Sequence, residues 1–151
     1  MTAQAARRAP ALLLDTNVLL DVLLKRDPWA TEAALLLDAI HRGVARGLVS
    51  AHAITTIHYI VERAAGRAAA RTAVSDILDV LDVVSLDASD FQRALSLGLA
   101  DYEDAVQVAA GLKAGADYLV SRDAKHFRSA PMRIHAPGEL LAILAPRHRP
   151  S

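Results

Sequence analysis

Three aspartates accompany different apolar segments of this chain, and their residue type could support chemistry. Asp15 follows the apolar run 11–14, Asp104 opens the apolar stretch 105–110, and Asp123 follows the segment 118–122. Carboxylates that meet at one edge of a parallel sheet bind hard divalent cations. A cation held in this way, with waters left on it, is the usual apparatus for phosphodiester hydrolysis. The residue types therefore predict a metal site with hydrolytic chemistry.

Short apolar strands that alternate with helices must position these aspartates. This alternation predicts one α/β domain with a parallel sheet of four to five strands and helices on both faces. Ligands bind such sheets at the carboxyl ends of the strands. Asp15 and Asp123 come just after strands, and Asp104 begins a helix that can reach the same edge. The expected strands are 11–14, 48–50, 83–86, 118–121 and 132–134, and the expected helices are 18–25, 29–44, 53–63, 69–81, 87–99, 101–113 and 139–144.

Residues at several helix starts predict how the helices begin. Thr16 or Asn17 is expected to cap the first helix, and Pro28 suits the first turn of the second. Ser89 with Gln92 fits a capping box in the helix over 87–99. The helix over 101–113 is apolar around nearly its whole circumference, which predicts that it is buried.

The composition limits the classes of function. The chain has 151 residues, of which 53% are hydrophobic, and this suits one domain over 11–145 between flexible segments 1–10 and 146–151. Lys+Arg and Asp+Glu both number 17, so any binding of nucleic acid must come from a local patch. The absence of cysteine excludes disulfides and thiolate sites. With no apolar run of membrane-spanning length and no signal peptide, we expect a cytoplasmic protein without a membrane partner.

Four segments of the chain resemble the PIN-domain family, specifically its toxin ribonucleases of VapC type. These segments are 14–21, 50–61, 101–105 and 121–127, and they span most of 11–135 in the family's order. The resemblance implies an endoribonuclease dependent on Mg²⁺ or Mn²⁺, in which water attacks phosphorus and leaves a 3′-hydroxyl and a 5′-phosphate. It also implies the toxin of a type II toxin–antitoxin pair, with RNA as substrate, a protein antitoxin covering the cleft, and a homodimer.

The resemblance also assigns roles to single residues. It places Asp15, Asp104 and Asp123 as the metal ligands and catalytic residues, with Asn17 and Ser121 as hydrogen-bonding groups beside them.

One position departs from the family pattern. Thr56 stands where the family usually has an acid, and Glu103 could supply the missing charge. Whether one or two ions bind, and how active the site is, stay open at this point.

Each aspartate also has a structural explanation. Asp101 and Asp104 fit a helix N-cap and its N3 partner, Asp15 could cap a helix, and Asp123 could be a turn residue. The occurrence of all three predicted ligands in the expected order favours the metal site. Asp21 lies four residues before Lys25, which predicts an exposed ion pair instead of a catalytic role.

Other polar residues lie near these positions in the sequence. Arg122, Lys125 and Arg128 are expected near the site, either as contacts to RNA phosphates or as a solvated loop. His52 and His58 could face the cleft, but solvent-facing or packed positions are commoner for histidine, and we expect those here.

Two other functions fit part of the pattern. A phosphoacceptor receiver domain also has an acidic pocket on a parallel sheet, but it needs paired acids after the first strand and a lysine after the fifth, and both are missing here. A catalytically weak PIN fold, kept as an RNA- or protein-binding module, is motivated by Thr56.

Overall fold

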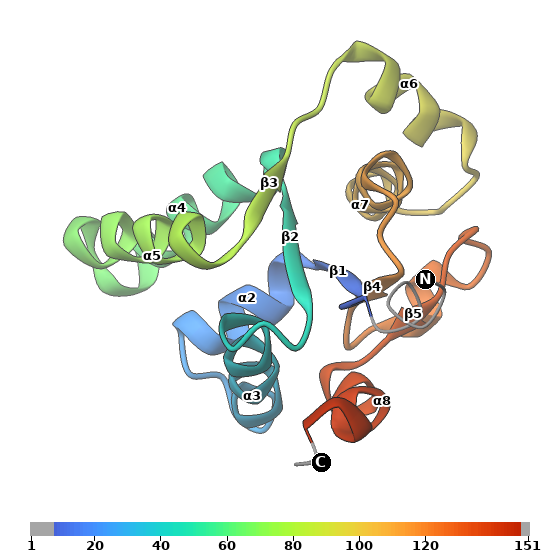
Figure 1. Cartoon of the computed structure of the whole chain (residues 1–151). Coiled ribbons are helices and arrows are strands. Elements are labelled where there is room, and N and C mark those ends of the chain that lie inside the picture. Colours follow the sequence, from blue (N-terminus) through green and yellow to red (C-terminus); the bar gives the residue numbers. More distant parts are fainter. Residues whose placement is uncertain (1–7, 149–151) are drawn as a thin grey trace.

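The computed structural model describes residues 8–148 and contains a sheet of five parallel strands (Figure 1). The strands lie in the order β3-β2-β1-β4-β5, so β1 is central, and every neighbouring pair is parallel. The predicted α/β class and parallel sheet are confirmed. The strands are β1 (Ala11–Leu14), β2 (Arg46–Ser50), β3 (Asp82–Val84), β4 (Tyr118–Val120) and β5 (Ile134–His135).

Helices fill the connections between the strands, as parallel pairing requires. The β1–β2 connection has two helices, the β2–β3 connection has two, and the β3–β4 connection has two. The helices are α2 (Thr16–Leu23), α3 (Ala30–His41), α4 (Ala51–Ala65), α5 (Arg67–Val80), α6 (Ala88–Ser96), α7 (Tyr102–Ala114), the 3₁₀ helix η1 (Ala124–Phe127) and α8 (Pro137–His148).

Alternating side chains of the strands bury two apolar cores, one on each face of the sheet. Leu12 and Leu14 of β1 pack in the core with side chains of α2, α3, α4, α5 and α8. Leu13, between them, packs in the other core with Val108 and Ala110 of α7. Helices therefore cover both faces, as predicted, and α7 is buried along most of its length.

Several predicted helix starts are wrong by one or more residues. Helix α2 begins at Thr16, so Asp15 itself occupies the N-cap position. Pro28 does not open α3, which begins at Ala30. The capping box of α6 is made by Asp87 and Asp90 in place of Ser89 and Gln92, because the helix starts earlier than that pairing assumed.

The two ends of the predicted domain differ in how the structure describes them. Helix α8 continues past residue 145 to His148, into the segment that the sequence predicted as a flexible tail. The predicted flexible residues 1–7 and 149–151 lie outside the described residues. Within the described part of the chain, no helix is long and apolar enough to cross a membrane.

Candidate metal centre

Asp15 lies at the carboxyl end of the central strand, where the backbone turns directly into α2. Its amide donates to the carbonyl of Val120 on β4 at 3.0 Å, so the parallel pairing of β1 and β4 extends to this residue. The side chain is only 5% exposed. The hydroxyl of Ser121 donates to Asp15 Oδ2 at 3.1 Å. The first predicted ligand is therefore a buried carboxylate that a neighbouring strand end holds in place.

Helix α7 brings further carboxylates to the site at its first turn. Asp101 is the N-cap, and its side chain accepts a hydrogen bond from the amide of Asp104 at 3.0 Å. Carboxylate oxygens of Asp101, Glu103 and Asp104 all lie within 4.8 Å of one another. The predicted capping role of Asp101 is confirmed, and it occurs in the same turn as the acidic group.

The pKa values show that Asp15 and the acids of α7 interact. Burial, and then the charge of Glu103, raise the pKa of Asp15 to about 7, with a smaller contribution from Asp104. Burial, and then the charges of Asp101 and Glu103, raise the pKa of Asp104 to about 6. Like charges that face one another disfavour ionisation. A divalent cation would relieve this repulsion, and the all-oxygen donor set suits Mg²⁺ or Mn²⁺.

Asp123 approaches the site through Ser121. The amide of Asp123 donates to Ser121 Oγ at 3.1 Å, and the same hydroxyl donates to Asp15. The charge of Asp123 contributes to the raised pKa of Asp104. Among the described residues, however, the compact acidic group comprises Asp101, Glu103 and Asp104, and neither Asp15 nor Asp123 belongs to it. The three predicted aspartates thus lie at one edge of the sheet without forming the tightest group there.

Two hydrogen-bonding partners of this edge were not assigned from the sequence: His52, for which a solvated or packed position was expected, and Gln107, which was given no role. His52 Nε2 lies 2.8 Å from Glu103 Oε2, and His52 Nδ1 lies 2.7 Å from Ser50 Oγ. Gln107 is fully buried, and its Nε2 donates to Thr16 Oγ1 at 3.0 Å, while its Oε1 has no partner. Two signals could have found them. His52 is the second residue after β2, at the same edge as Asp15, and Gln107 lies one helical turn after Glu103.

Helix α4 contributes no carboxylate at Thr56. The Thr56 hydroxyl donates to the carbonyl of His52 at 3.5 Å, one turn back on the same helix. Glu62, an acid six residues further along α4, has its Oε1 3.8 Å from His58 Nδ1 in an i, i+4 pair. The contact of α4 with the acidic group is instead made by His52.

Comparison with known proteins identifies the family. The protein-family model that describes the PIN domain matches residues 11–125 of this chain. The chain belongs to the PIN-domain family. No curated protein sequence matches it. The structure resembles DNA-bound VapBC from Salmonella typhimurium, with a TM-score of 0.68 and 17% identity over 85% of this chain and 98% of that one.

Two further solved structures share this PIN fold. VapC20 from Mycobacterium tuberculosis, described as a toxin that cleaves the sarcin–ricin loop, has a TM-score of 0.65 and 18% identity, covering 78% of this chain and 94% of its own. A toxin–antitoxin complex from Klebsiella pneumoniae has a TM-score of 0.65 and 20% identity, covering 83% of this chain and 97% of its own. At these identities the likeness shows the fold.

The predicted exposed pair between Asp21 and Lys25 is wrong in this PIN domain. Asp21 is buried, and its carboxylate accepts hydrogen bonds from Arg122 Nε at 2.8 Å and Nη2 at 3.3 Å. The guanidinium of Arg122 is therefore engaged by Asp21 and only partly exposed, whereas Lys125, three residues later, is exposed. Asn17, predicted beside the ligands, is exposed and accepts a hydrogen bond from Arg26 at 3.4 Å.

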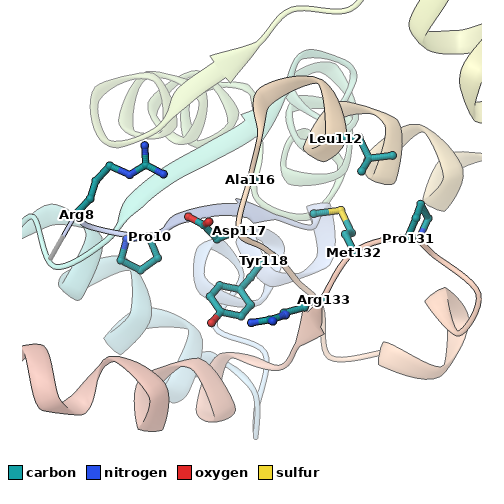
Figure 2. A pocket seen from close by; sticks show the side chains of 9 residues that line it. All are labelled: Arg8, Pro10, Leu112, Ala116, Asp117, Tyr118, Pro131, Met132 and Arg133. Atoms are coloured by element: carbon teal, nitrogen blue, oxygen red, sulfur yellow. The ribbon is translucent and has the colours of Figure 1, made fainter. Parts of the chain in front are cut away.

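An open pocket of about 700 Å³ lies elsewhere on the PIN domain (Figure 2). Its lining includes Pro10, Asp117 and Arg133, which directly precede β1, β4 and β5. This pocket therefore opens at the amino ends of the strands, whereas Asp15 and Ser121 follow the carboxyl ends of β1 and β4. None of the predicted site residues lines it, so the candidate centre is the carboxylate edge.

Proposed function

We propose that this PIN domain is a metal-dependent endoribonuclease that hydrolyses RNA phosphodiester bonds. The observation that carries the proposal is Asp15, a buried carboxylate whose pKa is raised to about 7 by burial and by the nearby acids of α7. A buried carboxylate beside other carboxylates destabilises a fold unless a proton or a cation neutralises it. A carboxylate perturbed by burial and by charged neighbours marks a candidate functional site.

The proposed ligands are Asp15, Asp104 and Asp123, with Glu103 as a further acid from α7. When bound, Mg²⁺ or Mn²⁺ polarises a phosphoryl oxygen and lowers the pKa of a water molecule. The protein's own groups orient the carboxylate oxygens of the proposed ligands. The hydroxyl of Ser121 donates a hydrogen bond to the carboxylate of Asp15 and accepts one from the amide of Asp123.

The groups around α7 complete this orientation. His52 holds the carboxylate of Glu103, and the cap formed by Asp101 fixes the first turn of the helix. The expected products of hydrolysis are a 3′-hydroxyl and a 5′-phosphate. Lys125 and Arg128 are exposed on and after η1, where they are available to RNA phosphates.

We further propose that the protein is the toxin of a type II toxin–antitoxin pair, acts in the cytoplasm and forms a homodimer. Support for an antitoxin comes from an apolar groove of about 370 Å³ between α2, α3 and α5, lined by residues that include Leu19, Leu37 and Ile77. An apolar groove of this kind suits a segment of a protein partner. Solved structures with this fold include VapBC complexes.

The second candidate function is a catalytically weak PIN fold that binds RNA or protein. It is favoured by Thr56, whose hydroxyl bonds to the backbone of its own helix and leaves α4 without an acid at that position. A site with fewer carboxylates binds a cation more weakly. The two candidates differ in metal affinity and in metal-dependent cleavage, which can be measured separately.

The test compares the wild-type protein with Asp15→Asn and with Asp79→Asn, a control on the exposed face of α5. Each is incubated with a panel of structured RNAs in Mg²⁺, Mn²⁺ or EDTA, and Mn²⁺ binding is measured by calorimetry. The ribonuclease proposal expects metal-dependent cleavage that Asp15→Asn abolishes and Asp79→Asn retains. Full cleavage by Asp15→Asn would refute it, and absent cleavage together with absent Mn²⁺ binding would favour the binding module.

A further inference from the structure

Asp21 and Arg122 form an ion pair next to the candidate metal centre, in which the carboxylate is buried and the guanidinium is partly exposed. Two nitrogens of the guanidinium, Nε and Nη2, donate to the two carboxylate oxygens of Asp21, which is 1% exposed. The ring of Trp29 covers the guanidinium, whose Cζ lies 3.9 Å from the ring centroid. A guanidinium held by two hydrogen bonds at its edge and by a ring at its face has little freedom to move.

The position of Arg122 in the chain links this pair to the site. Its neighbours are Ser121, which donates to Asp15, and Asp123, whose amide donates to Ser121. Asp21 lies on α2, the helix that begins directly after Asp15. The pair therefore joins the segment after β4 to the helix after β1, and these are the two segments that carry Asp15 and Asp123.

The energetics of this ion pair favour a geometric role. Removing the Asp21 carboxylate and most of the Arg122 side chain from water costs free energy that offsets much of their attraction, so an apolar pair of similar volume often stabilises a fold equally well. An apolar pair would lack direction, whereas a guanidinium bonded through two nitrogens sets the orientation of the backbone that carries it. The ion pair is thus suited to holding the segment 121–123 in one position.

We propose that Arg122 is a positioning residue, and that the clamp formed by Asp21, Arg122 and Trp29 holds the segment 121–123 in register with Asp15. One consequence, tighter binding of a divalent cation, rests on the proposed function. The other consequence, protection of the backbone at Asp123, does not. Both follow from the same geometry, because the hydrogen bonds of Ser121 to Asp15 and to Asp123 require this segment to stay in place.

The experiment compares Arg122→Lys and Asp21→Asn with the matched control Arg26→Gln. Lysine keeps the charge but loses the two-nitrogen contact and the planar group over Trp29, and asparagine keeps the shape of Asp21, so both variants are expected to fold. Arg26 also faces the carboxylate of Asp21, at 3.7 Å, but it belongs to the loop after α2. The measurements are amide hydrogen exchange at Asp123, Mn²⁺ affinity by calorimetry, and thermal unfolding.

The proposal expects Asp123 to exchange about tenfold faster, and Mn²⁺ to bind about tenfold more weakly, in both clamp variants but not in the control. Clamp variants that only melt at lower temperature, with Asp123 exchange and Mn²⁺ affinity equal to those of Arg26→Gln, would overturn it. Faster exchange at Asp123 in a protein whose wild type binds no Mn²⁺ would support the clamp and refute the proposed function.

Discussion

Replacing Asp15 with asparagine is expected to change how the stability of the metal-free protein depends on pH. The pKa of Asp15 is raised from 3.8 to about 7, first by burial and then by the charge of Glu103. Between these two values the folded protein keeps a proton on Asp15 that the unfolded chain has released. The stability linked to this proton is fully present below about pH 3.8 and is lost as the pH rises through about 7. Asparagine does not titrate and therefore removes this loss.

The magnitude follows from the difference between the two pKa values. The step from 3.8 to about 7 is close to 3 pH units, which at about 1.4 kcal/mol per unit corresponds to roughly 4 kcal/mol. The side-chain oxygen of the introduced asparagine can still accept the hydrogen bond of Ser121. If its NH₂ group has no partner, the free energy of unfolding falls by about 1–3 kcal/mol at every pH. This cost is the same at every pH and therefore does not affect the pH dependence. The free energy of unfolding of Asp15→Asn minus that of the wild type should therefore be roughly 4 kcal/mol larger at pH 8 than at pH 4.

The assay is urea unfolding in EDTA at several pH values between 4 and 8, with wild type, Asp15→Asn and the exposed control Asp79→Asn. Groups other than Asp15 titrate in all three proteins and cancel to first order in the differences. Asp79→Asn should follow the wild type at every pH. Parallel curves for wild type and Asp15→Asn would refute the reasoning, because they would mean that Asp15 ionises in the folded protein as easily as in the unfolded chain.

Three further predictions concern the metal, the missing acid and the core. Mg²⁺ should bind more tightly as the pH rises from about 5 to about 8, since it competes with the raised-pKa proton of Asp15; an affinity that is constant across this range by calorimetry would contradict this. Thr56→Glu should strengthen Mn²⁺ binding more than Thr55→Glu, which alters an exposed neighbour whose hydroxyl bonds to the same backbone carbonyl; equal effects would place position 56 away from the centre. Gly47→Ala should lower the free energy of unfolding by about 1–3 kcal/mol, because the added Cβ would meet the side chain of Leu81; an unchanged urea midpoint would show that the core there accommodates a methyl group.

Local patterns in the sequence were enough to predict the strands and the edge of the sheet at which the three aspartates gather. The four apolar residues before Asp15 form β1 and are all buried, and the alternation of their side chains between the two faces of the sheet places Leu12 and Leu13 in different cores. The uniformly apolar stretch after Asp104 is the buried helix α7. These features depend on the spacing of apolar residues along short segments, which can be read from the sequence directly. The predicted helix starts were less accurate, because adjacent polar residues such as Asp15 and Thr16 are all able to cap a helix.

The partners of the polar side chains were decided only by the tertiary structure. Arg122 bonds to Asp21 across 101 positions of sequence, and His52 bonds to Glu103 across 51. Residue types at such separations do not reveal which pair will meet, so Asp21 was assigned to its helical neighbour Lys25 and Arg122 to the solvent or to RNA. The packing of the helices against the central strands decides which polar side chains pair. A charge that this packing buries is stabilised only by the polar groups that the same packing places beside it. The edge of the sheet was therefore predictable from sequence, whereas the network that holds its carboxylates was not.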